Sequence, residues 1–170
     1  GIPLETMADA LARMQCVPGR LEEIGNARGV KIFVDYAHTD DALDKVLQAL
    51  REITQGRLIA VFGCGGNRDR TKRPVMGVVA AKRADFAILT SDNPRRENPR
   101  EIIAEIEAGF GAHHNYQVVE DRTEAIRQAV NMARPGDTVL IAGKGHERYQ
   151  EFVNTTVPFD DRQVVKDVLA

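Results

Sequence analysis

Polar and charged side chains gather in four short segments of the chain, and each segment directly follows an apolar run. The segments are residues 35–38, 63–73, 91–96 and 143–147. Together they hold carboxylate, guanidinium, amide and imidazole groups, which can bind a ligand that carries both positive and negative charges. The loops that leave the carboxyl ends of parallel strands meet at one edge of a sheet, where ligands bind. We therefore expect the four segments to form one site.

Each segment taken alone has a simpler interpretation. Glycines after a strand often serve only as tight turns, and residues 63–72 lack both the Gly-Lys-Ser/Thr ending of a P-loop and a clean dinucleotide fingerprint. The charges between Arg68 and Arg73 fit an exposed surface run, and Asp-Asn-Pro at residues 92–94 is typical of a turn or a helix start. His38 and His146 are not spaced as metal ligands, so no metal site is predicted.

Short runs with strand composition alternate with runs of helical periodicity. This alternation predicts an α/β fold with a Rossmann-like, mostly parallel sheet flanked by helices. Strands are expected at residues 30–34, 58–62, 86–90, 116–119 and 138–142, and residues 152–159 are expected to supply one antiparallel edge strand. Helices are expected near residues 74–84 and after the capping residues Thr39, Asn98, Asp121 and Asp160.

The composition is that of an ordinary cytoplasmic protein. The chain has 170 residues, enough for one domain, with 43% hydrophobic and 28% charged residues. The formal net charge of -2 offers no basic surface for nucleic acid, and no apolar run approaches the roughly 20 residues of a membrane helix. Cys16 and Cys64 form no disulfide framework. The opening Gly-Ile-Pro-Leu lacks a Met, which suggests a piece of a longer protein.

Five motifs make the chain resemble the Mur ligase family. They are Val17-Pro18-Gly19-Arg20, Asp35-Tyr36-Ala37-His38-Thr39, Phe-Gly-Cys-Gly-Gly-Asn-Arg-Asp-Arg at residues 62–70, Asp92-Asn93-Pro94-Arg95, and Ala-Gly-Lys-Gly-His-Glu at residues 142–147. They stand in the family's order, and the resemblance covers about residues 17–165. It is closest to the members that add meso-2,6-diaminopimelate to UDP-MurNAc-L-Ala-D-Glu in peptidoglycan synthesis. Asn67 and Arg148 depart from the pattern, which commonly has acids there.

The resemblance implies a domain order and a reaction. Family members have a UDP-sugar domain, a central ATPase domain with a P-loop, and a Rossmann-like C-terminal domain. Residues 17–170 resemble the third, and residues 1–16 resemble the end of the central domain, with a hinge near residues 17–20. The family uses ATP and Mg²⁺, bound mainly by the central domain, to turn a D-glutamate carboxylate into an acyl phosphate. The incoming amine attacks it, giving an amide, ADP and phosphate. The chain alone is therefore expected to be inactive.

The resemblance also assigns roles to single residues. Arg20 would be catalytic and would reach the ATP phosphates, where a guanidinium can stabilise the transferred charge. Asp35 would accept a hydrogen bond from the ribose, and His38 would lie nearby at the ATP site. The residues that match the amino-acid site are Arg68, Asn93, Arg95, Gly143 and Glu147, and Asp92 and Pro94 complete this substrate-binding set by shaping the loop.

The chemistry of meso-diaminopimelate fits these residue types. It is lysine-like but carries a second carboxylate beside the ammonium group at its far end. Arg95 and Arg68 can bind that carboxylate, and Glu147 with the Gly143 carbonyl can accept from the ammonium group. Lysine would leave a partly desolvated arginine unpaired, at a cost of about 1–3 kcal/mol. Relatives that add lysine typically lack an arginine at the position of Arg95.

Two alternative hypotheses remain. The first is a ligase of the same family that adds L-lysine, which Arg95 disfavours. The second is a non-catalytic, Rossmann-type nucleotide-binding module, which would explain the loops but not five motifs in one order. All three hypotheses share an α/β fold, so the fold does not decide among them.

Overall fold

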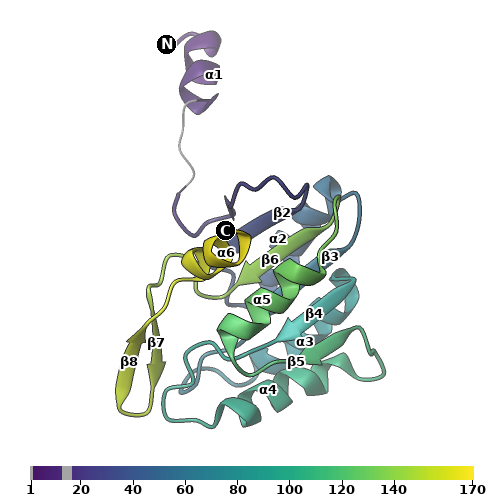
Figure 1. Cartoon of the computed structure of the whole chain (residues 1–170), viewed down its shortest axis with the longest axis vertical. Coiled ribbons are helices and arrows are strands. Elements are labelled where there is room, and N and C mark those ends of the chain that lie inside the picture. The colour runs from purple at the N-terminus through teal and green to yellow at the C-terminus, as the bar shows by residue number, and fades with distance from the viewer. Residues whose placement is uncertain (1, 13–16) are drawn as a thin grey trace.

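The computed structural model describes residues 2–12 and 17–170, and most of them form a single sheet with helices on both faces (Figure 1). Six strands in the described residues pair in the order β1-β2-β6-β3-β4-β5. Their bounds are β1 Glu22–Glu23, β2 Lys31–Asp35, β3 Leu58–Phe62, β4 Phe86–Leu89, β5 Tyr116–Val118 and β6 Thr138–Ala142. All neighbours pair in parallel except β1, which runs antiparallel to β2. The prediction of a mostly parallel sheet is confirmed.

The sheet has one apolar core on each face. On one face, α2 (Asp40–Ile53), α3 (Lys72–Arg83) and α4 (Pro99–Glu107), with the short 3-10 helix η1 (Ala108–Phe110), cover side chains such as Phe62 and Leu140. On the other face, α5 (Arg122–Met132) and α6 (Asp161–Leu169) cover side chains such as Ile59 and Val139. The central strands β3 and β6 are buried along their whole length, as strands covered on both faces must be.

Most helices begin where their capping residues predict. The side chains of Thr39, Asn98, Asp121 and Asp160 each accept a hydrogen bond from a backbone N–H in the first turn of the following helix. The helix expected at residues 74–84 begins at Lys72, and Thr71 before it makes no side-chain cap. Side-chain caps therefore fix where α2, α4, α5 and α6 begin. The loop before each of these helices must end at its capping residue.

The expectation of an edge strand at residues 152–159 is wrong. This region forms a separate antiparallel hairpin of β7 (Tyr149–Phe152) and β8 (Thr155–Pro158), and the antiparallel strand at the sheet edge is β1 instead. The two residues between β7 and β8, Val153 and Asn154, make a tight turn that reverses the chain. Figure 1 shows the hairpin projecting from the body beside the carboxyl end of the sheet.

The N-terminal segment contains the helix α1 (Leu4–Ala12), which stands apart from the body (Figure 1). Gly1 and residues 13–16, including Cys16, lie outside the described residues, so the predicted boundary at residue 16 stays a prediction. No described helix combines the length and the apolar character needed to cross a membrane.

Candidate functional site

The carboxyl ends of β2, β3, β4 and β6 open into one cavity of about 530 Å³. The residues that line it are Tyr36, His38, Thr39, Gly63, Cys64, Gly65, Arg68, Asp69, Lys72, Asp92, Asn93, Arg95, Gly143, Glu147 and Tyr149. Each of the four segments singled out in the sequence contributes to this lining. The predicted residues that line the cavity are His38, Arg68, Asp92, Asn93, Arg95, Gly143 and Glu147. Arg20, Asp35 and Pro94 are not among the lining residues.

Two glycines bring the loops into close contact. A Cβ at Gly63 would overlap the carbonyl oxygen of Thr90, and a Cβ at Gly66 would overlap that of Pro94. Pro94 therefore contributes its backbone to the packing of the loops. The glycine-rich loop after β3 is more than a tight turn, because it permits the close approach of the loop after β4.

A fully buried lysine, Lys144, lies close to two acidic residues that line the cavity, Asp92 and Glu147. The Lys144 side chain has no exposed surface, and its Nζ lies 2.9 Å from Asn93 Oδ1 and 3.2 Å from Glu147 Oε2. The carboxylate of Asp92 is 3.7 Å away, and Asn93 Nδ2 donates to Glu147 Oε2 at 2.9 Å. The ammonium group therefore balances two carboxylates and fixes the amide between them. Lys144 was not identified from the sequence, although it lies inside the motif at residues 142–147.

Arg95 also lines the cavity, and its charge is already paired. Its backbone has a φ of +52°, a left-handed conformation that is uncommon for a side chain of this size. Its Nε lies 2.7 Å from Glu151 Oε2, and its Nη1 donates to the Gly66 carbonyl oxygen at 2.9 Å. The expectation that lysine would leave this arginine unpaired needs correction, because Glu151 is a partner for Arg95 within the chain itself. Glu151 was not identified from the sequence.

A fully buried arginine, Arg73, joins the loops after β3 and β4. Arg73 has no exposed side-chain surface, and it donates to both oxygens of Glu97, at 2.9 and 3.0 Å, and to Glu105 at 2.8 Å. It also donates to the Gly65 carbonyl oxygen at 3.2 Å. Arg70 pairs with Glu105 from the surface. The interpretation of residues 68–73 as an exposed surface run therefore fails for Arg73.

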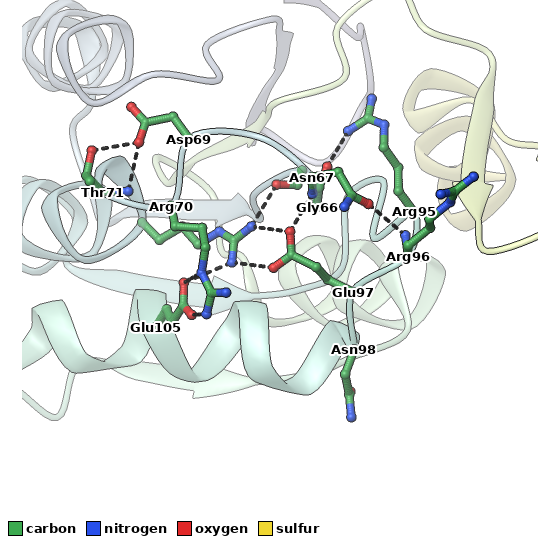
Figure 2. A network of polar contacts seen from close by, with 12 residues as sticks. Gly66, Asn67, Asp69, Arg70, Thr71, Arg95, Arg96, Glu97, Asn98 and Glu105 are labelled. Carbon is green, nitrogen blue, oxygen red and sulfur yellow. Dashed lines mark hydrogen bonds and ion pairs between the residues drawn. The ribbon is translucent and has the colours of Figure 1, made fainter.

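Figure 2 shows how the two loops meet at Asn67, Arg95 and Glu97. The Asn67 N–H donates to Glu97, and Asn67 Oδ1 accepts from the Arg96 N–H at 3.0 Å. The hydrogen bonds from Arg73, and then that from the Asn67 N–H, lower the pKa of Glu97 to about 2. This carboxylate is therefore ionised at neutral pH, and it holds the loop that carries Arg95.

The residues predicted for ATP lie together next to the cavity. The Arg20 guanidinium lies over the Tyr36 ring, 4.5 Å from its centre, and the Tyr36 ring also contacts those of His38 and His146. The carboxylate of Asp35 accepts from the Leu21 and Ala37 N–H groups, each at 2.7 Å. These contacts attach Arg20 to the end of β2. Tyr36 and His146 were not assigned as site residues from the sequence.

The chemical character of the site is that of binding and positioning. Cys64 lines the cavity, but burial raises the pKa of its thiol to about 12, so it is not a thiolate at neutral pH. The described residues contain no group of three or more His, Cys, Asp or Glu side chains arranged to hold a metal ion. The charged residues that line the cavity are two arginines, three carboxylates and one lysine, Lys72, which together suit a ligand of mixed charge.

The match to known proteins covers most of this architecture. The sequence pattern of the family described as "Mur ligase, glutamate ligase domain" matches residues 19–145, more than half of the chain. The chain belongs to the Mur ligase family. This match includes the first three segments of the cavity and the start of the fourth.

Relatives and solved structures narrow the comparison. The chain is 52% identical over 171 aligned residues to UDP-N-acetylmuramoyl-L-alanyl-D-glutamate--2,6-diaminopimelate ligase of Caldanaerobacter subterraneus subsp. tengcongensis, covering 100% of this chain and 35% of that protein. A solved structure of an enzyme with the same name is 43% identical, with a TM-score of 0.84, over 99% of this chain and 35% of that one. The chain thus spans about a third of the length of the curated relatives it matches.

A more distant structure shares the fold as a separate domain. It is a crystal structure of a domain from a putative UDP-N-acetylmuramate:L-alanyl-gamma-D-glutamyl-meso-diaminopimelate ligase of Haemophilus ducreyi 35000HP. The match has 20% identity and a TM-score of 0.59, and it covers 88% of this chain and 97% of that one. A domain of this fold can therefore exist without the rest of its protein. Both apolar cores of the present chain are likewise built from its own residues.

Proposed function

We propose that the chain is the C-terminal, amino-acid-recognising domain of an ATP-dependent ligase that adds meso-2,6-diaminopimelate to UDP-MurNAc-L-Ala-D-Glu. The observation that carries the proposal is the cavity itself, which Arg68 and Arg95 line together with Asp92 and Glu147. The far end of meso-diaminopimelate carries a carboxylate and an ammonium group on one carbon, so it needs both kinds of partner. The ligase family of the chain and its named relatives support the same substrate.

The two charges of the ligand's far end have separate partners in this proposal. Arg95, with Arg68, binds the carboxylate. Glu147 accepts from the ammonium group through Oε1, because Oε2 is already engaged by Asn93 and Lys144. The carbonyl of Gly143 is the second acceptor for the ammonium group. Asp92 and Pro94 shape the loop that carries Arg95. Lys144 offsets part of the negative charge of Asp92 and Glu147, which would otherwise repel the ligand's carboxylate.

The nucleotide end of the site lies at Arg20, Asp35 and His38. Arg20 contacts the phosphates of ATP, as the resemblance implies, and its attachment beside Tyr36 supports a fixed orientation for its guanidinium. We assign residues 17–170 to this domain, with the preceding residues belonging to the central ATPase domain. We expect Mg²⁺ on that central domain and assign it no ligand in this chain. The other partners are the remaining domains and the UDP-linked substrate, in the cytoplasm.

The L-lysine-adding ligase remains a second candidate because of one observation. Glu151 pairs with Arg95, so a bound lysine would not leave the arginine without a partner. The discrimination against lysine then depends on how much better the ligand's carboxylate binds Arg95 than Glu151 alone does. Membership of a ligase family disfavours the non-catalytic nucleotide-binding module.

An NMR titration of the isotopically labelled chain tests the proposal. We expect meso-diaminopimelate to shift the backbone signals around Arg68, Asn93 and Glu147, with no matching response to L-lysine. Arg95→Ala should abolish the response, whereas the control Arg96→Ala should retain it, because the exposed Arg96 is not among the residues that line the cavity. An equal response to lysine would favour the second candidate.

If the chain alone is silent, the same comparison is made by steady-state kinetics in the full-length enzyme. A kcat/KM for L-lysine equal to or above that for meso-diaminopimelate would then overturn the proposed substrate.

A further inference from the structure

The strand β7 is joined to the loop after β4 by three hydrogen bonds. The Glu151 N–H donates to Asn93 Oδ1 at 3.0 Å, and the Arg95 N–H donates to the Glu151 carbonyl oxygen at 3.0 Å. The Gln150 side chain, itself buried, donates to the Asp92 carbonyl oxygen at 2.9 Å. The backbone of Glu151 therefore holds the loop that carries both Asn93 and Arg95, whatever side chain stands at position 151.

The side chain of Glu151 makes a separate contact with the guanidinium of Arg95. The distance from Glu151 Oε2 to Arg95 Nε is 2.7 Å, and the side chain of Arg95 is 18% exposed against 40% for that of Glu151. The Gly66 carbonyl oxygen accepts a hydrogen bond from Nη1 of the same guanidinium. A guanidinium is planar and rigid, so two fixed nitrogens determine where its remaining N–H groups point.

The position of Glu151 keeps it out of the ligand's way. Arg95 lines the main cavity and also a smaller cavity of about 360 Å³, whose other lining residues are Asn67, Arg96, Glu151, Phe152 and Val153. Glu151 is not among the residues that line the main cavity. The Glu151 carboxylate thus contacts Arg95 from the side of the smaller cavity. Without this carboxylate, the guanidinium could turn into the smaller cavity.

We infer that Glu151 is a positioning residue for amino-acid selectivity: it orients Arg95 toward the far carboxylate of the incoming amino acid. This inference rests on the proposed function, in which Arg95 binds that carboxylate. Glu151 does not touch the substrate, and it shares Arg95 with the ligand because the two carboxylates approach different edges of one guanidinium. The charged pair also gives Arg95 a partner that does not depend on the ligand.

Steady-state kinetics of full-length enzymes carrying Glu151→Ala and Glu151→Gln test the inference. We expect Glu151→Ala to raise the KM for meso-diaminopimelate about tenfold with kcat changed by less than about twofold. Glu151→Gln keeps an oxygen that can accept from Arg95 Nε, so it should restore KM to within about threefold of wild type. Thr156→Ala, at the cross-strand partner of Glu151, is the control for damage to the hairpin and should behave as wild type.

The contact itself is checked without substrate by the Nε–H signal of Arg95 in NMR spectra of the chain. It should be visible in the wild type and in Glu151→Gln, and lost through solvent exchange in Glu151→Ala. A lower KM in Glu151→Ala would mean that Glu151 competes with the ligand, and an unchanged KM would mean that it orients nothing; either overturns the inference.

The preference of the wild-type enzyme and the KM of Glu151→Ala separate the proposed function from the role of Glu151. A wild-type enzyme that prefers L-lysine overturns the proposed function, and the selectivity role of Glu151 falls with it. A wild type that prefers meso-diaminopimelate, with KM unchanged in Glu151→Ala, overturns the role of Glu151 alone.

Discussion

Lys144 and Glu147 form an ion pair with a nitrogen–oxygen distance of 3.2 Å, and the lysine is the fully buried partner. Its ammonium group also contacts Asn93, whose amide donates to Glu147, so one buried charge supports the carboxylate to which we assign the ligand's ammonium group. A buried charge costs free energy unless every partner is in place. This arrangement is therefore sensitive to the loss of any one member.

Lys144→Met should destabilise the chain by about 3 kcal/mol, the low end for a broken buried pair, because Glu147 keeps some contact with water. The measurement is urea unfolding of the chain at pH 7. Lys45→Met removes an exposed pair with Asp41 and should cost less than about 1 kcal/mol. Equal losses in the two variants would contradict the role of the buried ammonium group.

The carboxylate of Glu97 should make the stability depend on acid pH. Its pKa in the folded chain is lowered to about 2 from 4.5, so its contribution is present above about pH 5 and is lost as the pH falls toward 2. Glu97→Gln should be less stable than the wild type at pH 7, and the difference should shrink between pH 5 and 3. Urea midpoints across this range give the comparison.

The control for that experiment is Glu52→Gln, at an exposed acid outside the Arg73 network. It should follow the wild-type curve. A constant difference between Glu97→Gln and wild type from pH 7 to pH 3 would show that the ionised carboxylate is not what stabilises the loop.

The buried pair of Arg122 and Asp161 joins α5 to α6, at distances of 2.8 and 2.9 Å, with no exposed surface on either side chain. Arg122→Met should cost about 3–5 kcal/mol by leaving Asp161 buried without its cation. The double variant Arg122→Met/Asp161→Leu should recover most of this loss. It should stay about 1 kcal/mol below wild type, because the Ala142 carbonyl also loses the donor it has in Arg122. Chemical unfolding measures all three, and a double variant no better than the single would refute this.

Gly63→Ala should destabilise the chain by about 1–3 kcal/mol, because its Cβ would overlap backbone atoms at Thr90 that cannot move aside. The matched control is Gly25→Ala, since a Cβ there would meet no atom within 4 Å. Its expected change is less than about 0.5 kcal/mol. Thermal or urea unfolding of both variants gives the comparison, and equal effects would remove the close approach of the two loops as the reason for glycine at position 63.

The chain by itself should neither release ADP nor form the amide, because the family resemblance assigns the P-loop and the UDP-sugar site to other domains. The assay is steady-state ligation with ATP, Mg²⁺, UDP-MurNAc-L-Ala-D-Glu and meso-diaminopimelate, with the full-length enzyme as the positive control. Turnover by the 170-residue chain would contradict the assignment.

The sheet was predictable because its strands are continuous apolar runs and its helices carry local caps. Thr39, Asn98 and Asp121 each cap the first turn of the helix that follows them, so the neighbouring sequence is enough to predict where these helices begin. The convergence of the four loops followed from strand direction alone. The hairpin was missed because a strand pattern does not reveal its partner, and β7 is bonded to a loop instead of the sheet.

The missed residues of the site share one physical reason. Glu151 and Arg73 act through partners far away in the chain, Arg95 in one case and Glu97 with Glu105 in the other. The spacing of residues within a short segment of sequence cannot indicate pairs that form between distant segments. Lys144 was visible inside a motif, but only its burial distinguishes a structural charge from an exposed one.

The place of β6 between β2 and β3 has a consequence for how the molecule is made. As the chain is synthesised, β3, β4 and β5 can pair in the order in which they emerge, whereas β2 meets only β1. Two unfinished pieces of sheet must wait for the strand that joins them, and that strand ends at the loop carrying Lys144 and Glu147. The docking of β6 therefore closes the sheet and completes the binding cavity in the same step, because the loops after β3 and β4 can meet earlier but the loops after β2 and β6 join them only then.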